Sequence, residues 1–172
     1  MGPRNSALGL AHVDVADLHV VRRPDGPPRL VESLSAADLA DRYARASALG
    51  TEWHRWSIYW DLADRGGTFD WAVSDGMAAR DVGSGLRSLV VLHGNPPGVA
   101  HVTGAPADLT APVFLSADGR PTDDPAAASA INPGNTFGRF IAASVQRYRP
   151  GGDLASERGW AGAQGVRAWQ IG

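Results

Sequence analysis

The chain contains no cysteine and no lysine. The lack of cysteine excludes disulfide bonds and thiolate metal sites within this chain. All sixteen basic residues are arginine, so a lysine Schiff base, and the aldolase chemistry that depends on one, is also excluded within it. The formal net charge is only −2 and no basic stripe stands out, so we do not expect a nucleic-acid partner.

Long apolar segments are also lacking. No stretch has the length and hydrophobicity of a membrane-spanning helix, so we expect no membrane partner. Met1–Val21 is interrupted by His12, Asp14, Asp17 and His19, and it lacks the uninterrupted apolar centre of a signal peptide. The sequence therefore indicates no cellular compartment.

The same N-terminal histidines and aspartates invite a comparison with a metal site. Amidohydrolase barrels open with His-x-His on their first strand, but here Asp14 takes the place of the second histidine after His12. No further ligands can be assigned from the sequence. We therefore expect neither a metal ion nor another cofactor.

The 172 residues have an ordinary apolar fraction, which suits a single domain over 1–172. The clearest strand is Trp53–Trp60, in which successive side chains take opposite faces. Bulky aromatic residues occur on both faces, which is typical of a parallel strand covered on both sides. Arg55 lies in the middle of this strand, and a buried guanidinium needs an acceptor close by.

Strands and helices are predicted to alternate along the chain. The expected elements are a first strand at Leu8–Val15 or Leu18–Val21, a helix from Ser35 to Gly50, the strand Trp53–Trp60, a helix from Trp71 to Val82, a strand at Leu86–Leu92 that is buried on both faces, a helix that begins at Pro133, and a strand at Val166–Ile171. Val99 to Asn132 is predicted to be a long irregular loop, a feature typical of binding loops. The order implies an α/β fold of four parallel strands with right-handed helical crossovers. This is about half of a (β/α)8 barrel, which takes about 250 residues.

One block resembles the second strand and second helix of clan A glycoside hydrolases, which are retaining (β/α)8 barrels. The matching residues are Arg55, Trp60, Gly67, Phe69, Asp70, Trp71 and Asp75. The sequence Leu92-His93-Gly94 also resembles the end of the third strand in that family. Relatives often have Glu-Pro where Ala63-Asp64 stands here, so any role of that glutamate does not carry over. The resemblance covers about Ser35 to Gly172 and implies the N-terminal half, strands 1–4, of an enzyme that hydrolyses O-glycosidic bonds of a carbohydrate.

Retaining hydrolysis requires two carboxyl groups about 5 Å apart. Glu32, Glu52 and Glu157 are not predicted at the carboxyl ends of strands, so we assign no catalytic residue and expect the chain alone to be inactive. In the resembled family the acid/base glutamate follows the fourth strand in Asn-Glu-Pro. The expectation is therefore a fragment, with Asn-Glu encoded directly after Gly172.

The resemblance implies four substrate-binding residues. Arg55 would keep the nucleophile ionised, and His93 would hydrogen-bond the substrate or the catalytic network. Asn95 could bind a sugar hydroxyl, and Trp60 could stack on a sugar ring. For each residue a structural role remains open: core acceptors around Arg55, a loop carbonyl at His93, a turn at Asn95 and barrel packing for Trp60. If the resemblance holds, Arg55, His93 and Asn95 converge at one end of the sheet.

A non-catalytic α/β module for carbohydrate binding or assembly is the alternative. Neither a phosphate-binding loop nor a serine nucleophile elbow is present to favour another α/β enzyme. Strand order separates the two readings, since a half-barrel requires sequential order. A half-barrel also has open edges, so self-association is expected.

Overall fold

A computed structural model describes residues 18–21, 29–32, 36–94, 101–102, 105–106 and 111–171. The chain divides into two compact units, Met1–Arg45 and Ala46–Gly172. The division falls inside helix α1 (Ala36–Ala48), which agrees with the helix predicted from Ser35 to Gly50.

The first unit contains a short antiparallel pair. Strand β1 (Leu18–Val21) pairs with β2 (Arg29–Glu32), with Leu18 opposite Glu32 and Val21 opposite Arg29. The prediction that Leu18–Val21 joins the parallel sheet is therefore wrong, because its hydrogen bonds go to a neighbouring strand instead. The other candidate for a first strand, Leu8–Val15, lies outside the described residues.

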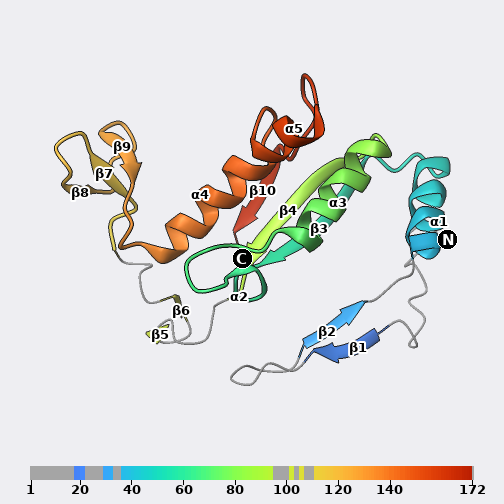
Figure 1. Cartoon of the computed structure of the whole chain (residues 1–172), viewed down its shortest axis with the longest axis horizontal. Helices are drawn as coiled ribbons and strands as arrows, with labels where there is room; N and C mark the ends of the chain where they lie inside the picture. Colours follow the sequence, from blue (N-terminus) through green and yellow to red (C-terminus); the bar gives the residue numbers. More distant parts are fainter. Residues whose placement is uncertain are drawn as a thin grey trace, which may run out of the picture. The chain divides into compact units, whose positions relative to one another are not determined.

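The second unit is built on a parallel sheet of three strands, β3 (Trp53–Tyr59), β4 (Arg87–His93) and β10 (Ala168–Ile171). The strands lie side by side in the order β10-β4-β3 (Figure 1), and both pairings are parallel. These are the second, third and fourth strands predicted from the sequence. The protein is thus a mixed α/β structure with a parallel sheet and helical crossovers.

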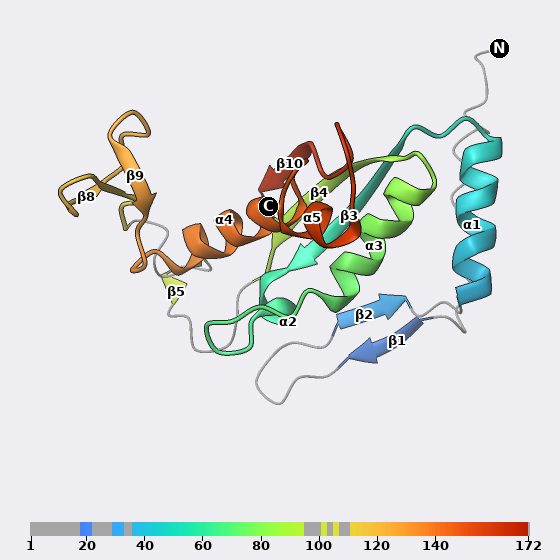
Figure 2. The ribbon, with the colours of Figure 1, turned by 45° about the horizontal axis from the view of Figure 1, so that its top comes forward.

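Four helices belong to this unit: α2 (Trp60–Ala63), α3 (Ala72–Gly83), α4 (Thr136–Tyr148) and α5 (Asp153–Arg158). Helix α3 connects β3 to β4 and runs alongside β4 (Figure 1 and Figure 2). Helix α4 lies between β4 and β10 in the sequence. Its N-cap is Asn135, whose side chain accepts a hydrogen bond from the Gly138 backbone N–H at 2.7 Å. Both predicted crossover helices are confirmed.

The hydrophobic core lies on one face of the sheet. Strand residues of this face pack in one buried cluster with residues of α3, α4 and α5: Trp56, Ile58, Val90, Leu92, Ala78, Phe140, Tyr148 and Leu154. On the opposite face Arg55 is exposed and Leu89 is only half-buried. In the described part of the chain the helices therefore cover one face. On the other face β3 exposes Trp53 and Arg55, so the prediction of a strand covered on both faces is wrong for β3, whereas β4 also buries Val91 on that face.

A largely buried ion pair ties α3 to α4. Asp75 accepts two hydrogen bonds from the Arg147 guanidinium and one from the Tyr148 hydroxyl, the last at 2.8 Å. The hydrogen bonds to Asp75 raise the pKa of Arg147 above its usual, already high value. Burial, reinforced by the hydrogen bond to Asp75, raises the pKa of Tyr148. Asp75, which belongs to the block that resembles the glycoside hydrolases, therefore has a structural role that accounts for an aspartate at this position.

The stretch from Val99 to Asn132 is not an irregular loop. It contains the antiparallel pair β5 (His101–Val102) and β6 (Ala105–Pro106), and a three-stranded antiparallel sheet of β7 (Phe114–Ser116), β8 (Pro121–Thr122) and β9 (Ala128–Ile131). Such short strands carry little periodicity, and turns set their pairing. Asn132 and Asn135 secure the sheet to the start of α4 by donating to the carbonyls of Pro112 and Ala111, each at 2.7 Å.

Candidate functional site

The sheet face that the helices leave uncovered is called the open face here. Because side chains alternate along a strand and paired residues share a face, the register assigns its members. They are Trp53, Arg55, Ser57 and Tyr59 of β3, Arg87, Leu89, Val91 and His93 of β4, and Ala168 and Gln170 of β10. Val91 is buried but lies outside the main core cluster, as expected for a residue on the other side of the sheet.

Arg55 spans the open face. Its Nη2 donates a hydrogen bond at 3.2 Å to Oε1 of Gln170, although β4 separates their two strands. The guanidinium is exposed, so the expectation of a buried charge in mid-strand is wrong. The Gln170 amide oxygen, not a described carboxylate, accepts a hydrogen bond from the charge here. The side chain can therefore meet a ligand that lies on the open face.

His93 lies at the carboxyl end of β4 on the same face. It pairs with Tyr59, and the two rings are 4.1 Å apart at an angle of 45°. Arg55 and His93 thus share one face of the sheet. Arg55 pairs with Leu89, four positions before His93, so the two Cα atoms are separated by roughly 13 Å along the strand direction. Arg55 therefore lies in mid-strand and His93 at the strand end, and Asn95 lies outside the described residues, so the convergence of all three at one end of the sheet stays a prediction.

Trp60 belongs to the core rather than to the open face. It is the first residue of α2, only 1% exposed, and its ring stacks on Phe140 at 5.7 Å and 12°. Phe137 packs against the same ring at 5.6 Å. The interpretation of Trp60 as a sugar platform does not fit this placement, because a sugar cannot reach the ring. The packing alternative does fit.

The open face of the described strands carries no carboxylate. Glu52 precedes β3 and lies 3.8 Å from Arg87, while Glu157 binds Arg147 from α5. Glu32 lies in β2 of the first unit. No paired carboxylates of the kind that glycoside hydrolysis requires are therefore present on this face among the described residues.

Two acidic residues near the carboxyl end of β3 were not predicted as site residues from the sequence. Asp61 lies in α2 and is only 6% exposed. Asp64 accepts hydrogen bonds from the backbone N–H groups of Gly66 and Gly67 at 2.7 and 3.0 Å and so shapes the turn after α2. Their positions directly after a strand were the available signal, but short polar segments of this kind also form ordinary turns.

A second polar cluster lies on the helix-covered face. The fully buried Asp81 of α3 accepts hydrogen bonds from Trp56 Nε1 at 2.9 Å and from Ser88 Oγ at 2.5 Å, and His54 Nδ1 lies 2.8 Å from it. Serine, histidine and aspartate meet here, but the serine hydroxyl bonds to the aspartate. A nucleophilic triad requires it to bond to the histidine. The cluster is therefore a structural joint between α3 and the sheet.

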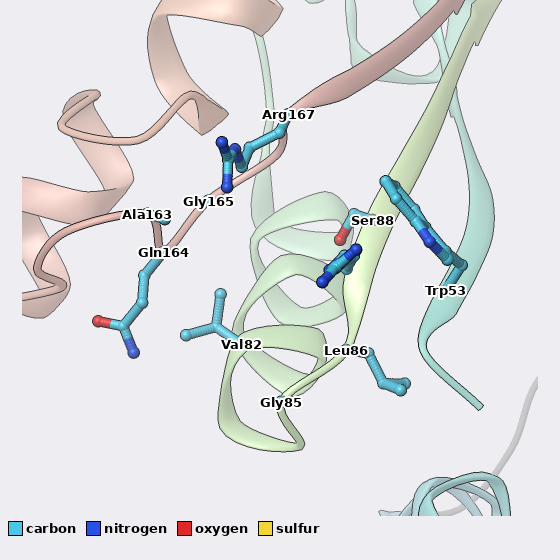
Figure 3. A pocket seen from close by; sticks show the side chains of 10 residues that line it. Trp53, Val82, Gly85, Leu86, Ser88, Ala163, Gln164, Gly165 and Arg167 are labelled. Carbon is cyan, nitrogen blue, oxygen red and sulfur yellow. The ribbon is translucent and has the colours of Figure 1, made fainter. Parts of the chain in front are cut away.

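A hollow of about 670 Å³ is present in the second unit, and Figure 3 shows the side chains that line it. Trp53, Ser88 and Arg167 are among the side chains that line it. Arg55, Trp60 and His93 do not line it. It opens where β4 and β10 begin, whereas the predicted site lies where the strands end.

Comparisons with known proteins assign no family to this chain. No protein-family model matches it, and no curated protein is similar to it. In the described part of the chain no helix has the length and apolar character needed to cross a bilayer. Nor do the described histidines and acidic residues form any group of three or more that could hold a metal ion.

Proposed function

We propose that this chain is the N-terminal half of a clan A retaining glycoside hydrolase barrel, and that its open face forms part of the barrel interior. The observation that carries the proposal is that three sequential parallel strands have their crossover helices packed on one face only. In a (β/α)8 barrel all helices lie outside, whereas a doubly wound sheet has helices on both faces. The resemblance around Arg55 and His93 adds the reaction: hydrolysis of an O-glycosidic bond in a carbohydrate.

Arg55 is the residue to which we assign an electrostatic role. Its guanidinium lies over the open face and reaches Gln170 near the carboxyl end of β10. In the resembled family the acid/base glutamate follows the corresponding strand. A cation at this place lowers the pKa of a neighbouring carboxylic acid and keeps a nucleophile ionised. His93, at the end of β4, is positioned to hydrogen-bond a substrate hydroxyl.

The described strands provide no acid and no nucleophile on the open face, so we propose that both come from strands beyond those described. The chain by itself is then inactive on glycosides. The reading frame downstream of Gly172 tests this. We expect it to encode Asn-Glu next, then three or four further strand–helix units with a second glutamate at a strand end. A stop codon directly after Gly172, with no Asn-Glu nearby in any frame, would refute the half-barrel.

A non-catalytic carbohydrate-binding or assembly module is the second candidate. The observation that favours it is the open face itself, which offers Arg55, Tyr59 and His93 without any carboxylate. Hydrogen-bonding side chains beside an aromatic ring suit sugar binding without hydrolysis. Glycan binding by this chain, weakened in Tyr59→Ala, together with no turnover by the longer reading frame, would establish this candidate in place of the hydrolase.

A further inference from the structure

The hollow at the opposite end of the sheet has the chemistry of a binding site for an anion. It lies between the α3–β4 turn and the segment that leads into β10 (Figure 3). Its volume of about 670 Å³ is in the range of small-molecule sites. The side chains that matter for recognition are Trp53, Leu86, Arg87, Ser88, Gln164 and Arg167.

Among the described residues, two guanidinium groups and no carboxylate side chain line the hollow. The Arg87 guanidinium carbon lies 5.6 Å from the centre of the Trp53 ring, a distance that fits a cation–π contact. Its nearest acidic group is Glu52, at 3.8 Å, and both side chains are largely exposed. Arg167 is exposed and forms no ion pair with any described residue. Both cations are therefore available to a ligand.

The other polar groups of the hollow also favour an acceptor-rich ligand. The Gln164 side chain uses Oε1 to accept from the Ala161 N–H at 2.8 Å, which leaves its amide N–H groups to donate. Ser88 gives its hydroxyl hydrogen to Asp81, so its oxygen can accept from a ligand hydroxyl. Asp81 itself is fully buried behind Ser88, and its charge is spread over hydrogen bonds inside the protein.

We propose that this hollow binds a small organic phosphate. Arginine guanidinium groups match phosphate oxygens with paired hydrogen bonds, and two such groups suit a doubly charged head. Trp53, 47% exposed, and Leu86 provide an apolar surface for a flat or carbon-rich part of the same molecule. The site lies at the amino ends of β4 and β10, so it does not depend on the glycosidase proposal.

Calorimetric titration of the intact chain with phenyl phosphate tests this site. We expect saturable binding, weakened at least about tenfold in Arg167→Met, since a charge-assisted pair is lost. Arg158→Met is the matched control, because Arg158 is exposed on α5 and does not line the hollow. Glu52→Gln should tighten binding, because it removes the negative charge beside Arg87. Both side chains are largely exposed, so the substitution should not disturb the fold.

Two further probes test separately whether the negative charge and the aromatic ring of the ligand contribute to binding. Phenyl glucoside lacks the charge and should not bind, and inorganic phosphate lacks the ring and should bind more weakly than phenyl phosphate. Equal loss of affinity in Arg167→Met and Arg158→Met would overturn the site, as would the absence of any phenyl phosphate binding. If inorganic phosphate binds as tightly as phenyl phosphate, the assignment of an organic ligand is wrong.

Discussion

Arg55 donates a hydrogen bond to Gln170 across the intervening strand β4, at 3.2 Å. The two residues are far apart in the sequence and meet only because β3, β4 and β10 follow one another in a parallel sheet. The contact lies on the face without helices, so it is accessible to a ligand. Under the proposed function, it links the strand that carries Arg55 to the strand after which the acid/base residue would follow.

Loss of the Asp75 carboxylate should destabilise the fold strongly. Asp75 and Arg147 side chains are only 17% and 14% exposed, and removing one partner of a buried pair costs about 3–5 kcal/mol. We expect Asp75→Asn to lower the free energy of unfolding by roughly 3 kcal/mol in urea titrations. Asp118→Asn is the control, because its pair with Arg120 is exposed and should contribute less than about 1 kcal/mol. Equal effects would contradict the buried-pair assignment.

Alkaline pH should destabilise the protein partly through Tyr148. Burial raises the pKa of its hydroxyl in the folded state above the usual value of 10.0, so the unfolded chain releases this proton first. The stabilising contribution is complete below pH 10 and is lost as the pH rises above it. We expect Tyr148→Phe to lower Tm at neutral pH but to reduce the fall of Tm above pH 10. Parallel Tm curves for both proteins would contradict this.

Substitution by alanine should change the stability of the protein in opposite directions at two glycines. A Cβ built at Gly152 overlaps the carbonyl oxygen of Gln146 and lies 2.9 Å from that of Arg149. Gly83, at the end of α3, has open space around the same position. We expect Gly152→Ala to cost roughly 2 kcal/mol, and Gly83→Ala to stabilise by about 0.5 kcal/mol. Chemical denaturation measures both effects. An unchanged free energy of unfolding in Gly152→Ala would contradict the predicted clash and show that the α4–α5 turn adapts.

Self-association follows from the exposed strand edges. In the described sheet, β3 and β10 each pair on one side only, and the described helices pack on the opposite face from Arg55. Unpaired edges and uncovered apolar residues favour association between chains. Sedimentation velocity across a concentration series should therefore show oligomers that dissociate on dilution. A monomer with a sharp two-state melt at all concentrations would argue against an incomplete barrel.

The strongest patterns in the sequence predicted the parallel sheet well. The apolar run ending in His93 is β4, the aromatic strand around Arg55 is β3, and the two crossover helices form where the sequence predicted them. These elements bury a continuous apolar face, so local pattern and packing agree. Burial on the second face could not be read from the residues, because aromatic side chains such as Tyr59 also occur half-exposed.

Long-range contacts account for what the sequence did not predict. The antiparallel pairing of Leu18–Val21 depends on a partner strand with only four residues. The buried Asp81 cluster joins side chains from two strands and a helix, so no local spacing in the sequence predicts it. Trp60 matched a family position, yet its environment is decided by Phe137 and Phe140 from a distant helix. Each case requires tertiary packing that short patterns do not encode.

The most direct test of the barrel proposal is the pH dependence of aryl-glycoside hydrolysis by the chain expressed with its downstream reading frame. We predict turnover, with kcat/KM reduced on the order of 10²-fold in Arg55→Met. The acidic limb of the profile should also move upward by about 1–3 pH units, because the nucleophile loses its neighbouring cation. Arg158→Met should leave both unchanged. Absence of turnover, or an Arg55→Met profile that matches the unmodified protein, would contradict the assignment of the open face as a glycosidase interior.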